Sequence, residues 1–207
     1  MMQANSPTTV PHLLIFARHP ELGRVKTRLA AGIGAEAALA VYAELLRHTF
    51  EVTAHIPAHK TLWLAETPIT SAAHTWPDYE QLVQFPGNLG QKMQAAFARA
   101  FAAGATAVLI IGTDCPGLTE EVLQQAYTAL ATHDVVIGPA EDGGYYLLGM
   151  RELYEDLFAD KSWSTESVLM HTLADADRLG LRVAQLPTLR DVDDIDDLRA
   201  WREQEEH

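Results

Sequence analysis

The feature that most constrains the fold of this chain is a regular alternation between short apolar runs and amphipathic helical patterns. The run AVLIIGT at 107–113 is apolar on both faces, which is typical of a central strand in a parallel sheet. The run HLLIFA at 12–17 predicts a second buried strand. Apolar residues over 35–54 recur at spacings of 3, 4 and 4, which predicts a helix with one buried face.

The same alternation continues along the rest of the chain. Further strands are predicted over 60–66, 81–85, 134–140, 144–150 and 181–187. Further helices are predicted over 90–103, 122–130, 165–179 and 193–204. This order predicts an α/β fold with a mostly parallel, open sheet covered by helices, in which the turn at 141–144 introduces one antiparallel strand. We expect one domain over 10–207, preceded by a disordered N-terminal tail over 1–9.

The composition excludes several classes of function. The 207 residues include 15 Lys and Arg against 28 Asp and Glu, a net charge of −13, which argues against a nucleic-acid or membrane surface but permits a small phosphorylated ligand. The single cysteine, Cys115, excludes an internal disulfide, and the nine histidines form no zinc-binding pattern. No run approaches the ~20 apolar residues of a membrane span. We therefore expect a cytoplasmic protein.

The loop at 18–28, after the first predicted strand, gathers basic residues in an acidic chain. They are Arg18, Arg24, Lys26 and Arg28, accompanied by one acid, Glu21. Open α/β sheets bind ligands beyond the carboxyl ends of their strands, where arginine and lysine suit phosphate oxygens. The position of the loop and its charge together predict an anion site. The alternative is a solvated surface loop paired with acids elsewhere.

Acidic residues follow three of the other predicted strands. Asp114 ends the central strand and is a natural ligand for a hard divalent cation, or else a turn residue. Glu141 and Asp142 lie in a loop where Asp142 could face Asp114, although Asp-Gly is also a favoured hairpin turn. Gly143 in that loop would let a ligand approach the backbone. Asp193 opens the last helix, where helix capping explains the acids without a metal.

Two further features each allow two interpretations. Gly87, Asn88, Leu89 and Gly90 precede a helix, so their backbone amides could receive a phosphate or a base edge, or could simply start the helix. Cys115 fits a small buried filler better than a nucleophile.

Taken together, the loops predict cations on one side of a cleft and carboxylates on the other. That arrangement suits a nucleoside phosphate bound with Mg²⁺ or Mn²⁺.

Several motifs of the chain resemble those of one known family. The segments IFARHPELGRVKTRLA, GNLGQKMQAAFARAF, IIGTDCPGLT, GPAEDGGYYLLGM, WST and DVDDIDDL are similar, in order, to motifs of the DUF2064 family, over about residues 12–200. These are glycosyltransferase-like proteins, also called radical-SAM/selenodomain-associated transferase 1, of the nucleotide-diphospho-sugar transferase superfamily. KTRLA, GNLG and DVDD are more distantly similar to 2-phospho-L-lactate and molybdenum-cofactor guanylyltransferases. The resemblance implies a three-layer α/β/α GT-A-like fold.

The resemblance also implies roles for individual residues. Arg18, Lys26 and Arg28 would contact donor phosphates, and the 87–90 loop would lie near the nucleobase. Asp114 would be the metal-binding acid. The motif has Thr113 and Cys115 beside this single aspartate, so a second ligand must come from elsewhere, and Asp142 and Asp193 are the candidates.

Three functions remain open at this point. Glycosyl transfer from a nucleotide-sugar to a small-molecule acceptor, with Glu141 or Asp142 as base, is the expectation that the family favours. Nucleotidyl transfer from a nucleoside triphosphate, with release of pyrophosphate, is favoured by the cationic loop, because a triphosphate carries more charge. A nucleotide-binding regulator without turnover is the third.

Overall fold

The structure is built around a seven-stranded mixed sheet. The computed structural model describes residues 10–66, 76 and 78–205, so the tail predicted over 1–9 lies outside the described residues. The strands are β1 (His12–Ala17), β2 (His59–Leu64), β3 (Glu80–Val83), β4 (Val108–Ile111), β5 (Val135–Pro139), β6 (Tyr145–Met150) and β7 (Val183–Gln185). Their order in the sheet is β3-β2-β1-β4-β6-β5-β7. Strand β6 is antiparallel to β4 and β5 while the other pairs are parallel, so the predicted mostly parallel sheet with one antiparallel strand is confirmed.

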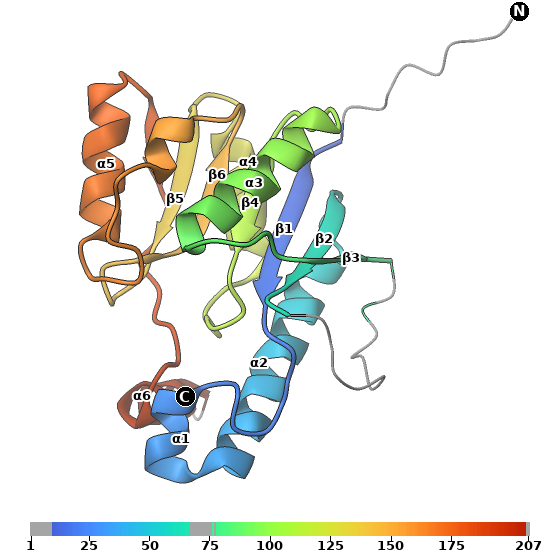
Figure 1. The fold of residues 1–207 in the computed structure, drawn as a ribbon, viewed down its shortest axis with the longest axis vertical. Helices are drawn as coiled ribbons and strands as arrows, with labels where there is room; N and C mark the ends of the chain where they lie inside the picture. The colour runs from blue at the N-terminus through green and yellow to red at the C-terminus, as the bar shows by residue number, and fades with distance from the viewer. Residues whose placement is uncertain (1–9, 67–75, 77, 206–207) are drawn as a thin grey trace, which may run out of the picture.

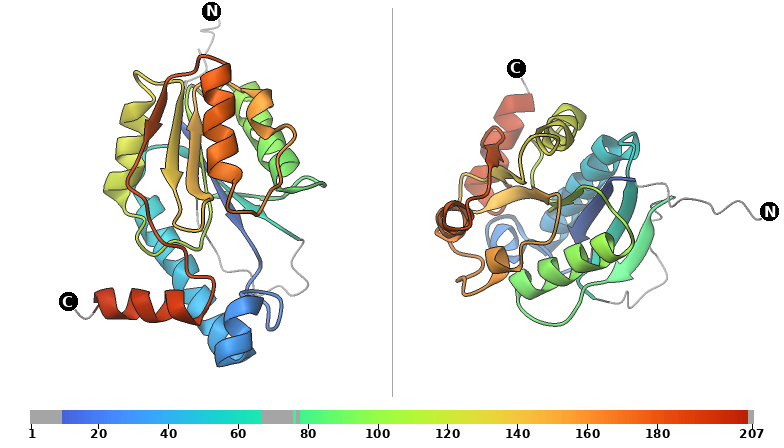
Figure 2. Two further views of the ribbon diagram at one scale, coloured as in Figure 1. Left: turned by 90° about the vertical axis from the view of Figure 1, so that its left-hand side faces the viewer. Right: turned by 90° about the horizontal axis from the view of Figure 1, so that it is seen from above.

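Helices cover both faces of the sheet (Figures 1 and 2). They are α1 (Thr27–Ile33), α2 (Ala35–Ala54), α3 (Leu89–Ala102), α4 (Glu120–Ala129), α5 (Val168–Arg178) and α6 (Ile195–Glu205), with a 3₁₀ helix, η1 (Glu155–Phe158). Helices α2 and α4 lie on one face, and α3, η1 and α5 lie on the other. Among the described residues, no helix combines the length and apolar character that a bilayer crossing requires.

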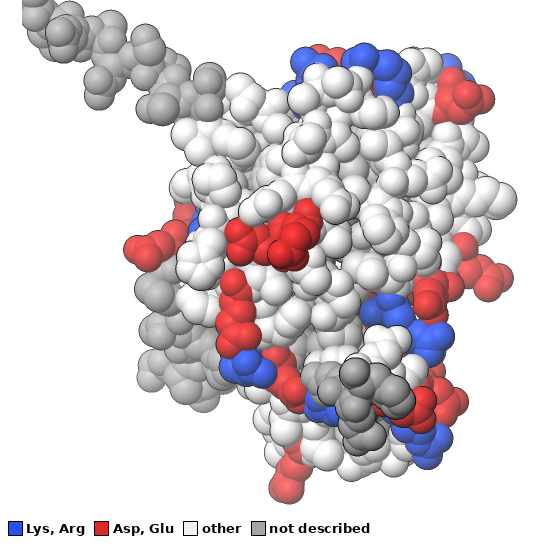
Figure 3. Space-filling view, turned by 180° about the vertical axis from the view of Figure 1, so that it is seen from behind, with Lys and Arg blue, Asp and Glu red and all other residues white. Residues whose placement is uncertain are grey.

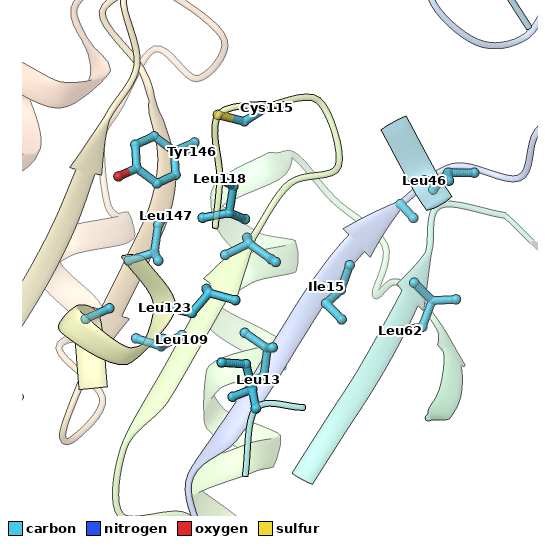
Figure 4. Packing of buried hydrophobic residues seen from close by; sticks show 14 of the residues in the cluster. Leu13, Ile15, Leu46, Leu62, Leu109, Cys115, Leu118, Leu123, Tyr146 and Leu147 are labelled. Carbon is cyan, nitrogen blue, oxygen red and sulfur yellow. The ribbon is translucent and has the colours of Figure 1, made fainter. Parts of the chain in front are cut away.

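The alternating side chains of the strands build two separate cores. Leu13 and Ile15 of β1 pack into the layer under α2 and α4, whereas Leu14 between them packs into the layer under α3 and α5. Figure 4 shows part of the first layer, in which Leu13, Ile15 and Leu109 lie along neighbouring strands. All four residues of β4 are buried, which explains why the strand is apolar on both faces.

A third, smaller core joins an early segment of the chain to a late one. Leu29 of α1, Val41 and Leu45 of α2, and Trp201 of α6 pack around Val192. These helices meet at the lower end of the molecule in Figure 1. In Figure 3 basic and acidic side chains are interspersed over this end. The contact brings the segment before α6 against the loop after β1.

Several predicted boundaries required correction. Helix α1 was not predicted, because seven residues containing Gly32 show little periodicity; the loop read over 18–28 therefore ends at Lys26. The strand predicted over 181–187 is reduced to three residues, and α5 begins at Val168 rather than at 165. None of these changes alters the layers.

The order of the strands determines where a ligand site can form. The chain leaves β1 toward β2 and β3 on one side, and then returns to place β4 on the other side of β1. Connections diverge at this switch point, so the loops after β1 and β4 separate and leave a crevice at their carboxyl ends. Arg18 directly follows β1, and Asp114 follows β4 after two residues.

Candidate functional site

A pocket of about 630 Å³ lies at the carboxyl ends of β1 and β4, a size typical of small-molecule sites. Its walls combine charged loops with an apolar side formed by α3 and the strands. The residues that matter for the argument are Arg18, Arg24, Lys26, Arg28, Leu89, Lys92, Met93, Asp114, Tyr145 and Asp193. The structure thus brings the predicted cationic loop and two of the predicted acids, Asp114 and Asp193, into one pocket.

Lys26 occupies the centre of the charged side. Its Nζ lies 2.6 Å from Oδ1 of Asp114 and donates a hydrogen bond of 3.0 Å to Oδ1 of Asp193. The lysine side chain is only 6% exposed, whereas those of Asp114 and Asp193 are 43% and 42% exposed. Burial lowers the pKa of Lys26, but the two carboxylates outweigh it, so the net shift is upward and the ammonium stays charged.

The backbone explains how these three residues meet. Val25 is buried in the core under α2, and Leu29 is buried in the core at the ends of α1 and α6, so Lys26 is held between two anchored residues. Lys26 has a left-handed backbone (φ 47°), which is uncommon for a residue with a side chain. Val192 N donates to the carbonyl oxygen of Asp114 over 2.9 Å, which joins the loop after β4 to the segment before α6.

The predicted arginines differ in their contacts. Arg28 is 73% exposed, and its guanidinium lies 3.7 Å from carboxylate oxygens of both Asp193 and Asp194. Arg24 pairs with Glu21 and Glu66. The backbone of Arg18 is held by the Tyr42 hydroxyl, which accepts from its amide over 2.8 Å and donates to its carbonyl oxygen over 3.0 Å.

Asp191 precedes Asp193 in the acidic segment before α6 and is not among the residues that line the pocket. Burial raises its pKa to about 7, and the nearby charges of Asp114, Asp142 and Asp193 add to the rise, while Lys26 opposes it. Two of these carboxylates, those of Asp114 and Asp193, contact the lysine directly. Mutual repulsion of this kind is relieved by a bound cation.

Helix capping divides the acids around the start of α6 into two groups. Asp194 Oδ1 accepts from the amides of Asp196 and Asp197, and Asp197 Oδ2 accepts from the amides of Asp193 and Asp194. The cap is thus formed by Asp194 and Asp197. Since a helix start needs few capping side chains, Asp191 and Asp193 are left for another role.

The donor chemistry of the site fits a hard divalent cation. Aspartate oxygens are the ligands that Mg²⁺ and Mn²⁺ prefer, and Asp114 and Asp193 already share one positive charge. Within the described part of the chain, however, no three His, Cys, Asp or Glu side chains lie close enough to hold a metal as they stand. A bound cation would therefore require these side chains to rearrange.

The two acids of the β5–β6 turn lie outside this pocket. Asp142 Oδ1 accepts a hydrogen bond from the Gly144 amide over 2.8 Å, so it stabilises its own turn, although its charge reaches Asp191. Glu141 pairs with Arg190 at 2.6 Å and lines a separate, smaller pocket beside Trp201. The structure does not bring Glu141 together with Asp114.

The predicted glycines make room for protein atoms. A Cβ on Gly143 (φ 84°) would lie 2.1 Å from the backbone oxygen of Glu166, and one on Gly90 would lie 2.3 Å from the ring of Trp163. Asn88 and Gln91 form a reciprocal capping box at the start of α3, so both of their amides are satisfied within the helix. Gly87 (φ 119°) lies against Gln91. Of the 87–90 loop, only Leu89 lines the pocket.

Cys115 is a buried packing residue, as predicted. It is 6% exposed and lies beside Tyr146 and Leu118 in the first core layer (Figure 4). Burial, followed by the charge of Asp191, raises the pKa of its thiol, which disfavours the thiolate.

Comparisons with known proteins agree with this architecture. Residues 47–165 match a family described as "Uncharacterized protein conserved in bacteria (DUF2064)". A crystal structure from Desulfovibrio desulfuricans G20, provisionally described as a nucleotide-diphospho-sugar transferase, is similar at 31% identity with a TM-score of 0.87, over 94% of this chain and 87% of that one. No curated protein matches the sequence.

More distant structures share the fold. The Rv0371c protein of Mycobacterium tuberculosis H37Rv, solved as a complex with manganese, is 20% identical with a TM-score of 0.57, over 94% of this chain and 98% of that one. A CMP:2-keto-3-deoxy-manno-octonic acid synthetase complexed with CTP is 12% identical with a TM-score of 0.55, over 95% of this chain and 99% of that one. These likenesses confirm the predicted GT-A-like fold of the nucleotide-diphospho-sugar transferases.

Proposed function

The chain belongs to the DUF2064 family, and on that premise we propose that it is a metal-dependent transferase that uses a nucleotide-activated donor. The observation that carries the proposal is the meeting of Lys26 with Asp114 and Asp193 in a pocket lined by further cations. Positive side chains and cation-binding acids within one pocket suit the phosphates of a nucleotide and their counter-ion. We further propose that residues 10–207 act as a single domain.

Glycosyl transfer from a nucleotide-diphospho-sugar to a small-molecule acceptor is the reaction we favour. The support is the likeness, at 31% identity, to a protein provisionally described as a nucleotide-diphospho-sugar transferase. In this reaction Arg18 and Arg28 would bind oxygens of the donor diphosphate, and Asp114 and Asp193 would hold Mg²⁺ or Mn²⁺. The metal, when bound, supplies positive charge that stabilises the departing nucleoside diphosphate. Neither Glu141 nor Asp142, the acids expected to act as base, lines the pocket, so we assign no base.

Nucleotidyl transfer from a nucleoside triphosphate is the second candidate. The specific observation in its favour is the number of cations that line the pocket, which are Arg18, Arg24, Lys26, Arg28 and Lys92. A triphosphate offers them more negative charge than a sugar diphosphate does. The CTP complex of a protein with the same fold is compatible with this reaction.

One assay separates these reactions. The protein is incubated with Mg²⁺ or Mn²⁺, panels of nucleotide-sugars and nucleoside triphosphates, and candidate acceptors, and the released products are identified. Nucleoside diphosphate supports glycosyl transfer, and pyrophosphate supports nucleotidyl transfer. Nucleotide binding without release of either product, across the panel, would instead support a regulator.

The Asp114→Asn variant tests the metal assignment. Loss of the carboxylate should abolish metal-dependent turnover, because an amide is a much poorer ligand for a hard cation. Asp177→Asn, on the exposed side of α5, is the matched control and should keep full turnover. Circular dichroism of both variants checks the fold. Full turnover in Asp114→Asn would contradict the assignment.

A further inference from the structure

The ammonium group of Lys26 occupies the position that a cation bound by both Asp114 and Asp193 would take. It contacts Oδ1 of Asp114 at 2.6 Å and Oδ1 of Asp193 at 3.0 Å, so one cation bridges carboxylates that come from two distant loops. The acids themselves are more than two-fifths exposed, which leaves their remaining surface open to the pocket. A divalent cation that binds the two Oδ1 atoms competes with the lysine for them.

The fold holds Lys26 in this bridging position between the two acids. Exposed ion pairs are easily exchanged with water, but this lysine side chain is 6% exposed and its backbone is held in the left-handed region between buried Val25 and Leu29. A buried ammonium that loses its partners is strongly destabilised, because neither water nor another anion replaces them. Lys26 therefore keeps these contacts until another cation takes its place beside the acids or another anion takes theirs.

The other cations of the pocket do not share this position. Arg28 is 73% exposed and its closest acid oxygens lie at 3.7 Å, beyond hydrogen-bond distance. Lys92 lines the same pocket and has no ion pair within the described residues. Lys26 is thus distinguished from a neighbouring lysine in the same pocket by its two direct contacts.

We propose that Lys26 is an internal counter-cation that holds Asp114 and Asp193 until a divalent cation displaces it, and that a phosphate group of the nucleotide then takes up its charge. The phosphate part of this inference rests on the proposed function; the competition with the metal does not. Metal binding and nucleotide binding are then coupled through one side chain. Because such coupling is reciprocal, each ligand strengthens the binding of the other by the same factor.

The first test measures Mn²⁺ affinity without any nucleotide, by titration of the free-ion EPR signal. Lys26→Met removes the competing ammonium, so we expect Mn²⁺ to bind roughly 10-fold more tightly than to the wild type, within the 5–150-fold range typical of site coupling. Lys92→Met is the matched control, since it removes the same charge from the same pocket without touching the acids, and it should change the affinity much less. Unchanged affinity in Lys26→Met, or equal changes in the two variants, would overturn the inference.

The second test uses the wild-type protein and does not depend on the stability of a variant. Lysine acetylation is followed residue by residue by mass spectrometry. Lys26 should be nearly unreactive in the metal-free protein, and its acetylation rate should rise several-fold at saturating Mn²⁺, while the rate at Lys92 stays constant. No rise at Lys26 would mean that the metal does not displace it and would refute the exchange.

The third test adds the nucleotide. With a panel of nucleoside diphosphates, Mn²⁺ and nucleotide should strengthen each other in the wild type, and the coupling factor should fall in Lys26→Met. If no nucleotide binds at all, the proposed function fails, whereas the two metal-only tests still decide the role of Lys26. An equal coupling factor in both proteins would overturn the phosphate part of the inference.

Discussion

Replacement of Gly143 by alanine distinguishes two reasons for a glycine in the β5–β6 turn. From the sequence alone, this glycine was expected to let a ligand approach the backbone. In the structure the space beside its Cα is taken by the backbone oxygen of Glu166, 2.1 Å from an ideal Cβ. The turn is also tied to α5, because the Leu169 amide donates to the carbonyl oxygen of Gly143 over 3.0 Å. A methyl group at this position therefore pushes on backbone rather than on a flexible side chain.

The expected cost has two parts. A side chain at a left-handed backbone position, here φ 84°, costs about 1–2 kcal/mol. Insertion of a methyl group against fixed neighbours costs typically about 1–3 kcal/mol. Together, the two effects should lower the free energy of unfolding of Gly143→Ala by about 2–5 kcal/mol.

Gly180→Ala provides the matched control. Gly180 also has a left-handed backbone (φ 69°), but nothing lies within 4 Å of its ideal Cβ. This variant suffers the backbone cost alone, and both variants gain the same small stabilisation from a less flexible unfolded chain. Their difference, about 1–3 kcal/mol, isolates the contact with Glu166.

Urea denaturation, followed by circular dichroism, measures the free energy of unfolding of both variants, and equal m-values make the two free energies comparable. Equal losses of stability in the two variants would refute the packing argument. If Gly143→Ala, unlike Gly180→Ala, then also bound the donor more weakly, ligand approach would be the better explanation for the glycine.

Two further variants test other parts of the structure. Asn88→Ala removes the side chain that caps α3 by accepting from the Gln91 amide, and it should lower the free energy of unfolding by about 1 kcal/mol, which urea denaturation can measure. Hydrogen bonding from Lys161, and secondarily from Arg178, lowers the pKa of Asp175, so this carboxylate contributes stability above its unfolded pKa of about 3.9 and loses it as the pH falls through its lower folded value. Asp175→Asn should therefore be less stable than the wild type at about pH 7, and the difference should shrink toward zero by about pH 2. A difference in urea midpoints that is independent of pH would contradict the assignment.

The strands and helices that form the layers could be predicted because their pattern of apolar residues is contained in neighbouring positions of the sequence. Strand β4 is buried on both faces and therefore had to be apolar throughout, whereas α2 is buried on one face and shows a helical period. Helix α1 lacks such a signal, since it is short and Leu29 is its only buried residue. It is stabilised by its contact with α2, which directly follows it, and with α6, which lies near the other end of the chain.

In the candidate site, too, residue types could be predicted from local sequence, but their long-range contacts could not. The motif DVDDIDDL includes Asp191, but the sequence could not show that the charges of Asp114 and Asp142, which belong to other loops, act on it. The motifs also placed Glu141 in the site, although its pairing with Arg190 turns it toward a different pocket. For both acids, the deciding contacts lie far away in sequence.

By itself, then, the sequence determined the α/β class, most of the strands and helices, and a set of charged residues at the strand ends. These features depend on the apolar period and the charge of residues that are neighbours in the sequence. Only the tertiary structure decided that Lys26 bridges acids 88 and 167 residues away. It also decided that Gly143 makes room for backbone and that Gly90, in α3, makes room for an indole ring. The physical reason is that these contacts depend on the angles at which the loops leave the sheet. Those angles follow from the packing of the whole chain.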